Sequence, residues 1–191
     1  MNPDGLDVAR KVARALESVG IDYLIGGSMA SSFVGKPRST MDVDFVVRMT
    51  QAQIQPLVEA LGDDFFVDPS SLARAVRERS SANLIHSHSA IKADLFILGS
   101  LPHEQAQMDR RRRMQVSDDP ADLLYISSPE DTVIQKLRWF RLGGEVSDHQ
   151  WKDVLAVLRY NRTALDRGYL ASGAKAFGVD DLLKRADSEA T

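Results

Sequence analysis

Two aspartates separated by one residue, Asp42 and Asp44, lie in the apolar stretch 41–47. In a β-strand, side chains two residues apart project from the same face, so both carboxylates would lie side by side. The intervening apolar residues would face the opposite, buried side: Met41, Val43, Phe45 and Val47. Adjacent carboxylates repel each other unless a cation lies between them, and Mg²⁺ prefers such oxygen ligands together with substrate phosphates. The alternative is a strand end at which both aspartates face water.

A third aspartate, Asp94, lies within the apolar segment 90–98. A charged side chain inside a buried strand is costly unless it has a partner or binds a metal. Beside the first two carboxylates, Asp94 would complete a site for two metal ions and a general base. The alternative is a buried ion pair with Lys92, which lies on the same strand face.

A glycine pair followed by a serine, Gly26-Gly27-Ser28, stands between an expected strand at 23–25 and an expected helix at 29–34. Glycines let backbone N–H groups approach a phosphate, and a helix N-terminus favours an anion. Ser28 can cap the helix or donate its hydroxyl to a phosphate oxygen. The simpler interpretation is a tight strand-to-helix turn.

In this order, the glycine pair, the aspartate pair and the later aspartate resemble the DNA-polymerase-β-like nucleotidyltransferase superfamily. The flanking residues look similar to the toxin nucleotidyltransferases of abortive-infection toxin–antitoxin systems. Their Gly-Gly-x-x-Ala start is matched by Gly26 to Ala30. Their Arg-x-Thr-x-Asp-x-Asp-Phe stretch is approximately matched, since Arg38 and Thr40 keep its spacing.

The resemblance implies a nucleotidyltransferase that moves a nucleoside monophosphate from an NTP to an acceptor and releases pyrophosphate. Catalysis and the binding of two Mg²⁺ ions, or Mn²⁺ as a substitute, would fall to Asp42, Asp44 and Asp94. The nucleotide would be bound by Gly26, Gly27, Ser28 and Lys136. Lys136 matches a lysine that a later helix of the family supplies near the triphosphate, and the next helix carries an aspartate. Asp148 and Asp153 are the candidates for that aspartate.

Several acceptors and roles stay open under this resemblance. The leading hypothesis is a toxin that modifies a tRNA end and has a cognate antitoxin, followed by transfer to a small molecule or a protein. A second class is a non-catalytic or antitoxin-type binding protein that keeps the fold. A third is a minimal nucleotidyltransferase that acts as an antitoxin by modifying its partner toxin. The presence of all three carboxylates, Asp42, Asp44 and Asp94, favours an enzyme.

Four consecutive arginines, Arg110, Arg111, Arg112 and Arg113, could bind an RNA backbone or a triphosphate. Such a run is more often a solvated face, and we expect that here. Acids such as Asp118 and Asp119 could pair with the run if it has a structural role.

The elements that would position these residues define an α/β (α+β) fold, with a mixed sheet flanked by helices and a helical C-terminal subdomain. Period-two and helical patterns alternate up to a strand at 123–126, and only helical patterns follow Ser128-Pro129. We therefore expect a catalytic domain at 1–127 and a helical subdomain at 128–191. The expected elements are helices at 6–19, 29–34, 51–61, 69–79 and 102–108, strands at 23–25, 41–47 and 123–126, and a hairpin of 83–87 with 90–98.

The composition excludes several other classes. The chain has no cysteine, so disulfides, thiolate metal sites and a cysteine nucleophile are excluded. The net charge of −3 does not indicate a strongly basic nucleic-acid binder. Neither a signal-peptide pattern nor an apolar run of about 18 residues is present, so we expect a cytoplasmic protein with no membrane partner.

Overall fold

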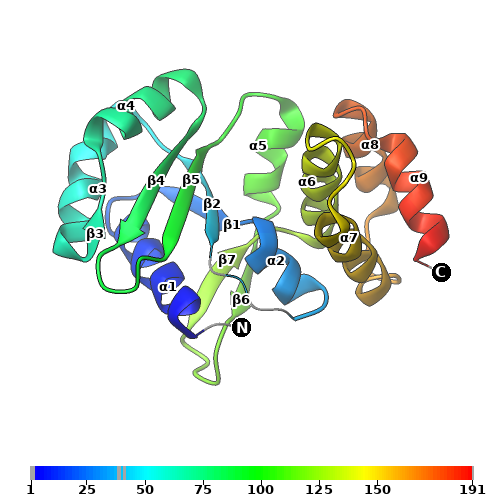
Figure 1. The fold of residues 1–191 in the computed structure, drawn as a ribbon, viewed down its shortest axis with the longest axis horizontal. Coiled ribbons are helices and arrows are strands. Elements are labelled where there is room, and N and C mark those ends of the chain that lie inside the picture. Colours follow the sequence, from blue (N-terminus) through cyan, green and yellow to red (C-terminus); the bar gives the residue numbers. More distant parts are fainter. Residues whose placement is uncertain (1–2, 38–39, 41, 191) are drawn as a thin grey trace.

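The computed structural model describes residues 3–37, 40 and 42–190. Within these ranges the chain forms a mixed sheet with helices on both faces, followed by a run of helices (Figure 1). The predicted fold class is therefore confirmed. The expectations for Arg38 and Met41 lie outside the described residues.

Seven strands of the described chain form one sheet in the order β3-β4-β5-β2-β1-β7-β6. Their bounds are β1 Asp22–Ile25, β2 Val43–Arg48, β3 Phe65–Phe66, β4 Ser81–His86, β5 Lys92–Ile97, β6 Arg112–Gln115 and β7 Leu123–Ile126. Strand β2 runs parallel to β5 and antiparallel to β1, while β1 runs parallel to β7. The parallel pairing of β2 with β5 joins two segments that are distant in sequence, and it places the Asp44 strand beside the Asp94 strand.

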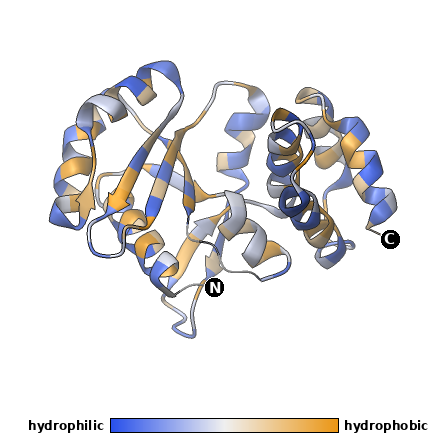
Figure 2. Cartoon of the chain, viewed as in Figure 1, coloured by the Kyte–Doolittle hydropathy of each residue, from blue (hydrophilic) through white to orange (hydrophobic). Residues whose placement is uncertain are grey.

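The helices before residue 128 cover both faces of this sheet. They are α1 Pro3–Ser18, α2 Gly27–Val34, α3 Ile54–Leu61, α4 Pro69–Glu78 and α5 Pro102–Asp109, with short 3₁₀ turns at Gln51–Gln53 and Gly62–Asp64. Helices α1 and α4 contact the sheet, and α3 packs against both of them. Helix α5 contacts β1, and α2 contacts β2. Figure 2 shows both hydrophilic and hydrophobic residues along the outer helices, as expected for helices with one buried face.

Four helices follow residue 128 and gather on one side of the sheet domain, coloured yellow to red in Figure 1. They are α6 Pro129–Leu142, α7 Asp148–Tyr160, α8 Arg167–Ala176 and α9 Asp180–Glu189. Ser128 caps α6 by accepting a hydrogen bond from the N–H of Asp131, and Ser147 caps α7 in the same way from Gln150. Helix α2 packs against α6 and α7, so it links the helical part to the sheet.

One large cluster of buried apolar side chains joins the two parts. The apolar positions predicted to lie behind the aspartate pair, Val43, Phe45 and Val47, are fully buried in it. So are Val133 and Leu137 of α6. The opposite sheet face has a smaller cluster under α5, formed by Leu24, Leu98 and Met108 and contacted by Val46. The division at residue 127 into two domains stays a prediction.

The predicted elements are present, with shifted bounds. Strand β2 begins at Val43, so Asp42 precedes the strand instead of lying within it. Strand β6, formed by part of the arginine run, was not predicted. Its residues Arg112 to Gln115 lack apolar alternation, and the strand exists because it pairs with β7 at the sheet edge. No helix of the described residues is long and apolar enough to cross a membrane.

Candidate active site

Two of the three predicted catalytic carboxylates are cross-strand neighbours. Asp44 in β2 is in register with Asp94 in the parallel strand β5. Residues opposite each other on adjacent strands are about 4.8 Å apart at the backbone and project from the same sheet face. The exposed residue Asp42 is close enough to act electrostatically on Asp44. The structure thus places Asp44 and Asp94 side by side, with Asp42 near enough to affect the charge of Asp44.

The surroundings of Asp44 disfavour its ionisation. Burial raises the pKa of Asp44, and the negative charges of Asp94 and Asp42 raise it further. The positive charges of Lys136 and Lys92 act in the opposite direction without cancelling this effect. A cation beside Asp44 would relieve both the repulsion and the burial cost.

Asp94 has one partner and one unpartnered oxygen. The Lys92 ammonium lies 2.9 Å from Oδ2 of Asp94, which is the ion pair that the sequence left open as the alternative to a metal. The same pair raises the pKa of Lys92. Oδ1 of Asp94 is buried and has no hydrogen-bond partner among the residues that the structure describes.

The geometry and the charge of the aspartates can be compared with what a Mg²⁺ site requires. As placed, no three Asp, Glu or His side chains of the described chain converge closely enough to hold a metal ion. The donor set nevertheless fits, since Asp44 and Asp94 are neighbours, Asp44 resists ionisation and Asp94 keeps an unpartnered buried oxygen.

The glycine pair brings the backbone of α2 against the aspartates. The N–H of Gly26 donates to the carbonyl of Asp44 at 2.8 Å, and Gly27 has a positive φ of 53°. A Cβ atom added at Gly27 would overlap the Asp44 carboxylate, so only glycine fits this position. Helix α2 then begins without a side-chain cap, and its first turn includes Ser28. Uncapped N–H groups at a helix start suit a phosphate.

Lys136 lies in a buried polar network and is 3% exposed. Its Nζ atom lies 2.7 Å from Oδ2 of Asp153 and donates to Oε1 of Gln150 at 3.2 Å. Ser31 donates to the same Asp153 oxygen at 3.2 Å. Of the two candidate aspartates on α7, Asp153 therefore contacts the lysine, while the side chain of Asp148 is 88% exposed.

A cleft of about 570 Å³ runs between the sheet and α6, and we call it the α6 cleft. The predicted residues that line it are Gly26, Gly27, Ser28, Asp44 and Lys136. Sequence reasoning missed the other lining residues of α6, among them Thr132, Gln135 and Trp139. Their spacing of three and four residues was the available signal, because such positions share one helix face.

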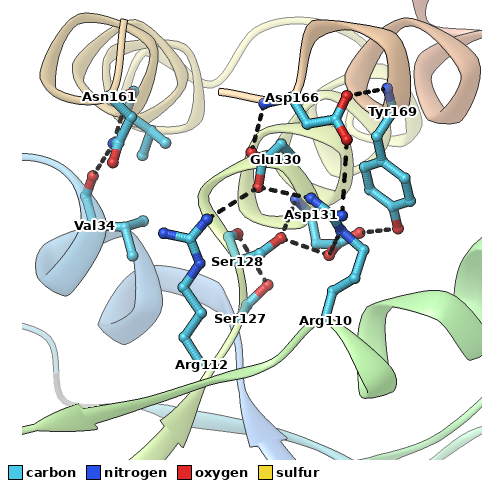
Figure 3. Close-up of polar contacts among 11 residues, drawn as sticks. Val34, Arg110, Arg112, Ser127, Ser128, Glu130, Asp131, Asn161, Asp166 and Tyr169 are labelled. Carbon is cyan, nitrogen blue, oxygen red and sulfur yellow. Dashed lines mark hydrogen bonds and ion pairs between the residues drawn. The ribbon is translucent and has the colours of Figure 1, made fainter. Parts of the chain in front are cut away.

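Arg110 and Arg112 of the arginine run contact acids at the start of α6, so the expected solvated face is corrected in part (Figure 3). The guanidinium of Arg110 lies 3.3 Å from Glu130 and 3.9 Å from Asp131, and it stacks on the Tyr169 ring at 3.9 Å. Arg112 is 3.9 Å from Glu130. The partners are acids at the start of α6, not Asp118 or Asp119 as the sequence suggested.

The other two arginines of the run lie near the ring of Tyr125. Arg111 lies 3.1 Å from Asp22 and stacks over Tyr125, while the exposed Arg113 is 5.9 Å from the centre of the same ring. Only Arg112 and Arg113 are exposed, so the solvated-face interpretation holds for half of the run.

Glu130 and Asp131 show how this cluster balances charge at the start of α6. Burial raises the pKa of Glu130, but backbone N–H groups, including that of Asp166, together with Arg110 and Arg112, hold its pKa below the ordinary value. For Asp131, burial is the larger effect and the pKa is raised, although Ser128 and Tyr169 both donate to it. The cluster ties α6 to α8 and to the segment before β6.

Comparison with known proteins identifies the fold. No family model and no curated protein matches the chain. Among solved structures, an antigenic nucleotidyltransferase-like protein from Paracoccidioides brasiliensis superposes with a TM-score of 0.58 at 18% identity, covering 97% of this chain and 93% of the other. The antibiotic-resistance factor ANT(2'')-Ia gives a TM-score of 0.56 at 12% identity, with 100% of both chains covered. The lincosamide antibiotic adenylyltransferase LnuA, bound to lincomycin, gives 0.51 at 13% identity, covering 82% and 96%.

This chain therefore has the nucleotidyltransferase fold. The likeness spans almost the whole of both chains, including the helices after residue 128. The fold is thus the one that the resemblance of the glycine and aspartate motifs implied.

Proposed function

We propose that this protein is a Mg²⁺-dependent nucleotidyltransferase that moves a nucleoside monophosphate from an NTP to a hydroxyl acceptor. The observation that carries the proposal is the register of Asp44 with Asp94, directly beside the glycine turn at Gly27. The solved structures that share the fold include an antibiotic-resistance factor and a lincosamide antibiotic adenylyltransferase, which supports the general kind of reaction.

The residues divide the work between binding and proton transfer. Asp42, Asp44 and Asp94 would hold Mg²⁺, with Mn²⁺ as a substitute, and the metal would supply charge neutralisation at the triphosphate. Gly27 and Ser28 at the start of α2 would bind the β- and γ-phosphates. Lys136 would neutralise their charge from the floor of the α6 cleft, where Asp153 orients it.

The proposed reaction is an in-line displacement at the α-phosphate of the NTP. The acceptor oxygen forms a bond to the α-phosphorus, the bond from that phosphorus to the bridging β-oxygen breaks, and pyrophosphate leaves. Asp94 would accept the proton of the attacking hydroxyl. Its buried, unpartnered Oδ1 is the atom that we assign to this step.

The proposal also concerns which acceptor receives the nucleoside monophosphate and what biological role the transfer serves. The hypothesis of a toxin that modifies a tRNA end and has a cognate antitoxin rests on residues 26–30 and 38–45, which resemble those of such toxins. The internal ion pairs of Arg110 and Arg111 remove part of the surface that the sequence offered for RNA. Small-molecule and protein acceptors are therefore tested alongside RNA, with no acceptor preferred.

The test uses purified protein and each of the four NTPs labelled at the α-phosphate, with Mg²⁺. Total cellular RNA, cell lysate and a small-molecule extract are the acceptor arms. We expect label to enter one arm together with pyrophosphate release, and both signals to disappear in Asp44→Asn. Binding of NTP without transfer to any arm would favour the non-catalytic alternative. A small neighbouring reading frame whose product co-purifies would identify a toxin–antitoxin pair.

A further inference from the structure

The side of α6 that lines the cleft carries a row of residues that runs beyond the proposed phosphate site. Thr132, Gln135, Lys136 and Trp139 occur at the three- and four-residue spacing of one helix face, and all four line the cleft. Trp139 is 51% exposed, whereas Thr132 and Lys136 are buried, at 4% and 3% exposed. The cleft is thus deep and polar at Lys136 and opens toward Trp139, one helical turn further along.

An aromatic side chain of the sheet faces the tryptophan across the cleft. Phe96 lies in β5 two residues after Asp94, hence on the same sheet face, and its ring centre is 6.2 Å from that of Trp139. Val46 of β2 is in register with Phe96 and also lines the cleft. An exposed tryptophan next to a phenylalanine and an aliphatic side chain provides a surface for a flat ring.

We propose that Trp139 and Phe96 bind the nucleobase of the NTP, and this inference rests on the proposed function. A ligand whose phosphates contact Gly27, Ser28 and Lys136 would extend along the row on α6 to reach Trp139. The distance from the Asp44–Asp94 pair to the row of Val46 and Phe96 is two strand residues, about 6.6 Å. That distance suits the ribose and base that follow an α-phosphate held at the aspartates.

The course of the cleft favours the nucleotide over the acceptor as the occupant of this end. Asp42, Asp94 and Lys92 do not line the cleft, whereas the proposed phosphate-binding residues do. The acceptor must reach the α-phosphate from the Asp94 side, away from the leaving pyrophosphate. The Trp139 end is continuous with the phosphate end, so one molecule can occupy both.

The test compares ligands with and without a base. Dissociation constants for each NTP and for inorganic tripolyphosphate, both with Mg²⁺, are measured by calorimetry on the wild-type protein, Trp139→Ala and Trp139→Phe. Stacking of a base on an aromatic ring contributes enough that Trp139→Ala should bind NTP about 5- to 150-fold more weakly. Tripolyphosphate binding should not change, and Trp139→Phe should retain most of the NTP affinity.

Fluorescence provides a second readout that depends on contact with the ring. The chain has two tryptophans, and Trp151 is 9% exposed and donates to Glu189, away from the cleft. NTP, but not tripolyphosphate, should quench the Trp139 emission. Phe66→Ala is the matched control, since this phenylalanine is 68% exposed, lies on the edge strand β3 and does not line the cleft.

The outcomes separate this inference from the proposed function. Unchanged NTP affinity in Trp139→Ala, with tight binding by the wild type, would overturn the base site and leave nucleotide transfer standing. An equal loss of NTP and tripolyphosphate binding would also overturn it, because the tryptophan would then only shape the cleft. A wild-type protein that binds no NTP would overturn both.

Discussion

The Cα atom of Gly27 lies against the carboxylate of Asp44, so closely that a Cβ atom at position 27 would overlap Oδ2 of the aspartate. The same glycine has a φ of +53°, and residues other than glycine adopt this backbone conformation only at a cost in conformational free energy. Backbone conformation and side-chain packing thus both require glycine at the point where the strand β1 passes into α2. The contact couples the phosphate-binding turn to the catalytic strand.

Gly27→Ala should therefore abolish nucleotide transfer, because the added methyl group displaces the Asp44 carboxylate. The control is Gly62→Ala, since Gly62 has a φ of +55° but nothing within 4 Å of an added Cβ atom. Both variants should lose about 1–2 kcal/mol to backbone strain. Thermal unfolding and the transfer assay check this. An active Gly27→Ala protein would contradict the role assigned to this contact.

Asp44→Asn should abolish transfer and raise the melting temperature in the absence of metal. Because the pKa of Asp44 is raised in the folded protein, its ionisation costs stability above that pKa, and the cost vanishes as pH falls below the unfolded value of 3.8. The stability gain of the variant should thus be present at pH 7 and shrink on acidification. Melting curves in a chelator at several pH values measure it.

The matched control for this substitution is Asp148→Asn, whose carboxylate is 88% exposed and does not line the α6 cleft. It should leave transfer and the pH dependence of stability unchanged. Mg²⁺ should raise the melting temperature of the wild type but not of Asp44→Asn. A variant that is less stable than the wild type at pH 7 without metal would show that the repulsion is compensated elsewhere.

Lys136→Ala should cost about 3–5 kcal/mol of stability, since it removes the ammonium that pairs with the buried carboxylate of Asp153. NTP affinity should fall by about one to two decades, because a charge-assisted contact contributes roughly 1.5–3 kcal/mol. In the double variant with Asp153→Ala, much of the stability should return but the NTP affinity should not. A double-mutant cycle measures both quantities. Full recovery of NTP binding would limit the lysine to a structural role.

Arg110→Ala should destabilise the protein by about 3 kcal/mol, because it removes the nearest cation from the buried carboxylate of Glu130 and the ring contact with Tyr169. Arg113→Ala should change stability by less than about 0.5 kcal/mol, since this exposed side chain has only the distant ring contact with Tyr125. Denaturant unfolding checks both. If both variants bound RNA more weakly at normal stability, the run would be an RNA-binding surface.

The residues that do the proposed chemistry were predictable because their signals are local. Each signal can be recognised within a few residues of sequence. The signals are an aspartate pair with period-two spacing, a glycine pair before a helix and an aspartate in an apolar strand. The helix start at Ser128 was predictable for the same reason, since this cap contacts an N–H group only three positions away. The motif order also implied the fold that solved structures share.

The partners of these residues were decided only by the tertiary structure. The register of Asp44 with Asp94 depends on a parallel strand pairing, and the choice of Asp153 over Asp148 depends on how α7 packs on α6. The arginine run is charged at every position, so its sequence could not distinguish a solvated face from a cluster bound to Glu130. Contacts between residues that are distant in sequence follow the path of the whole chain, and no local pattern encodes that path.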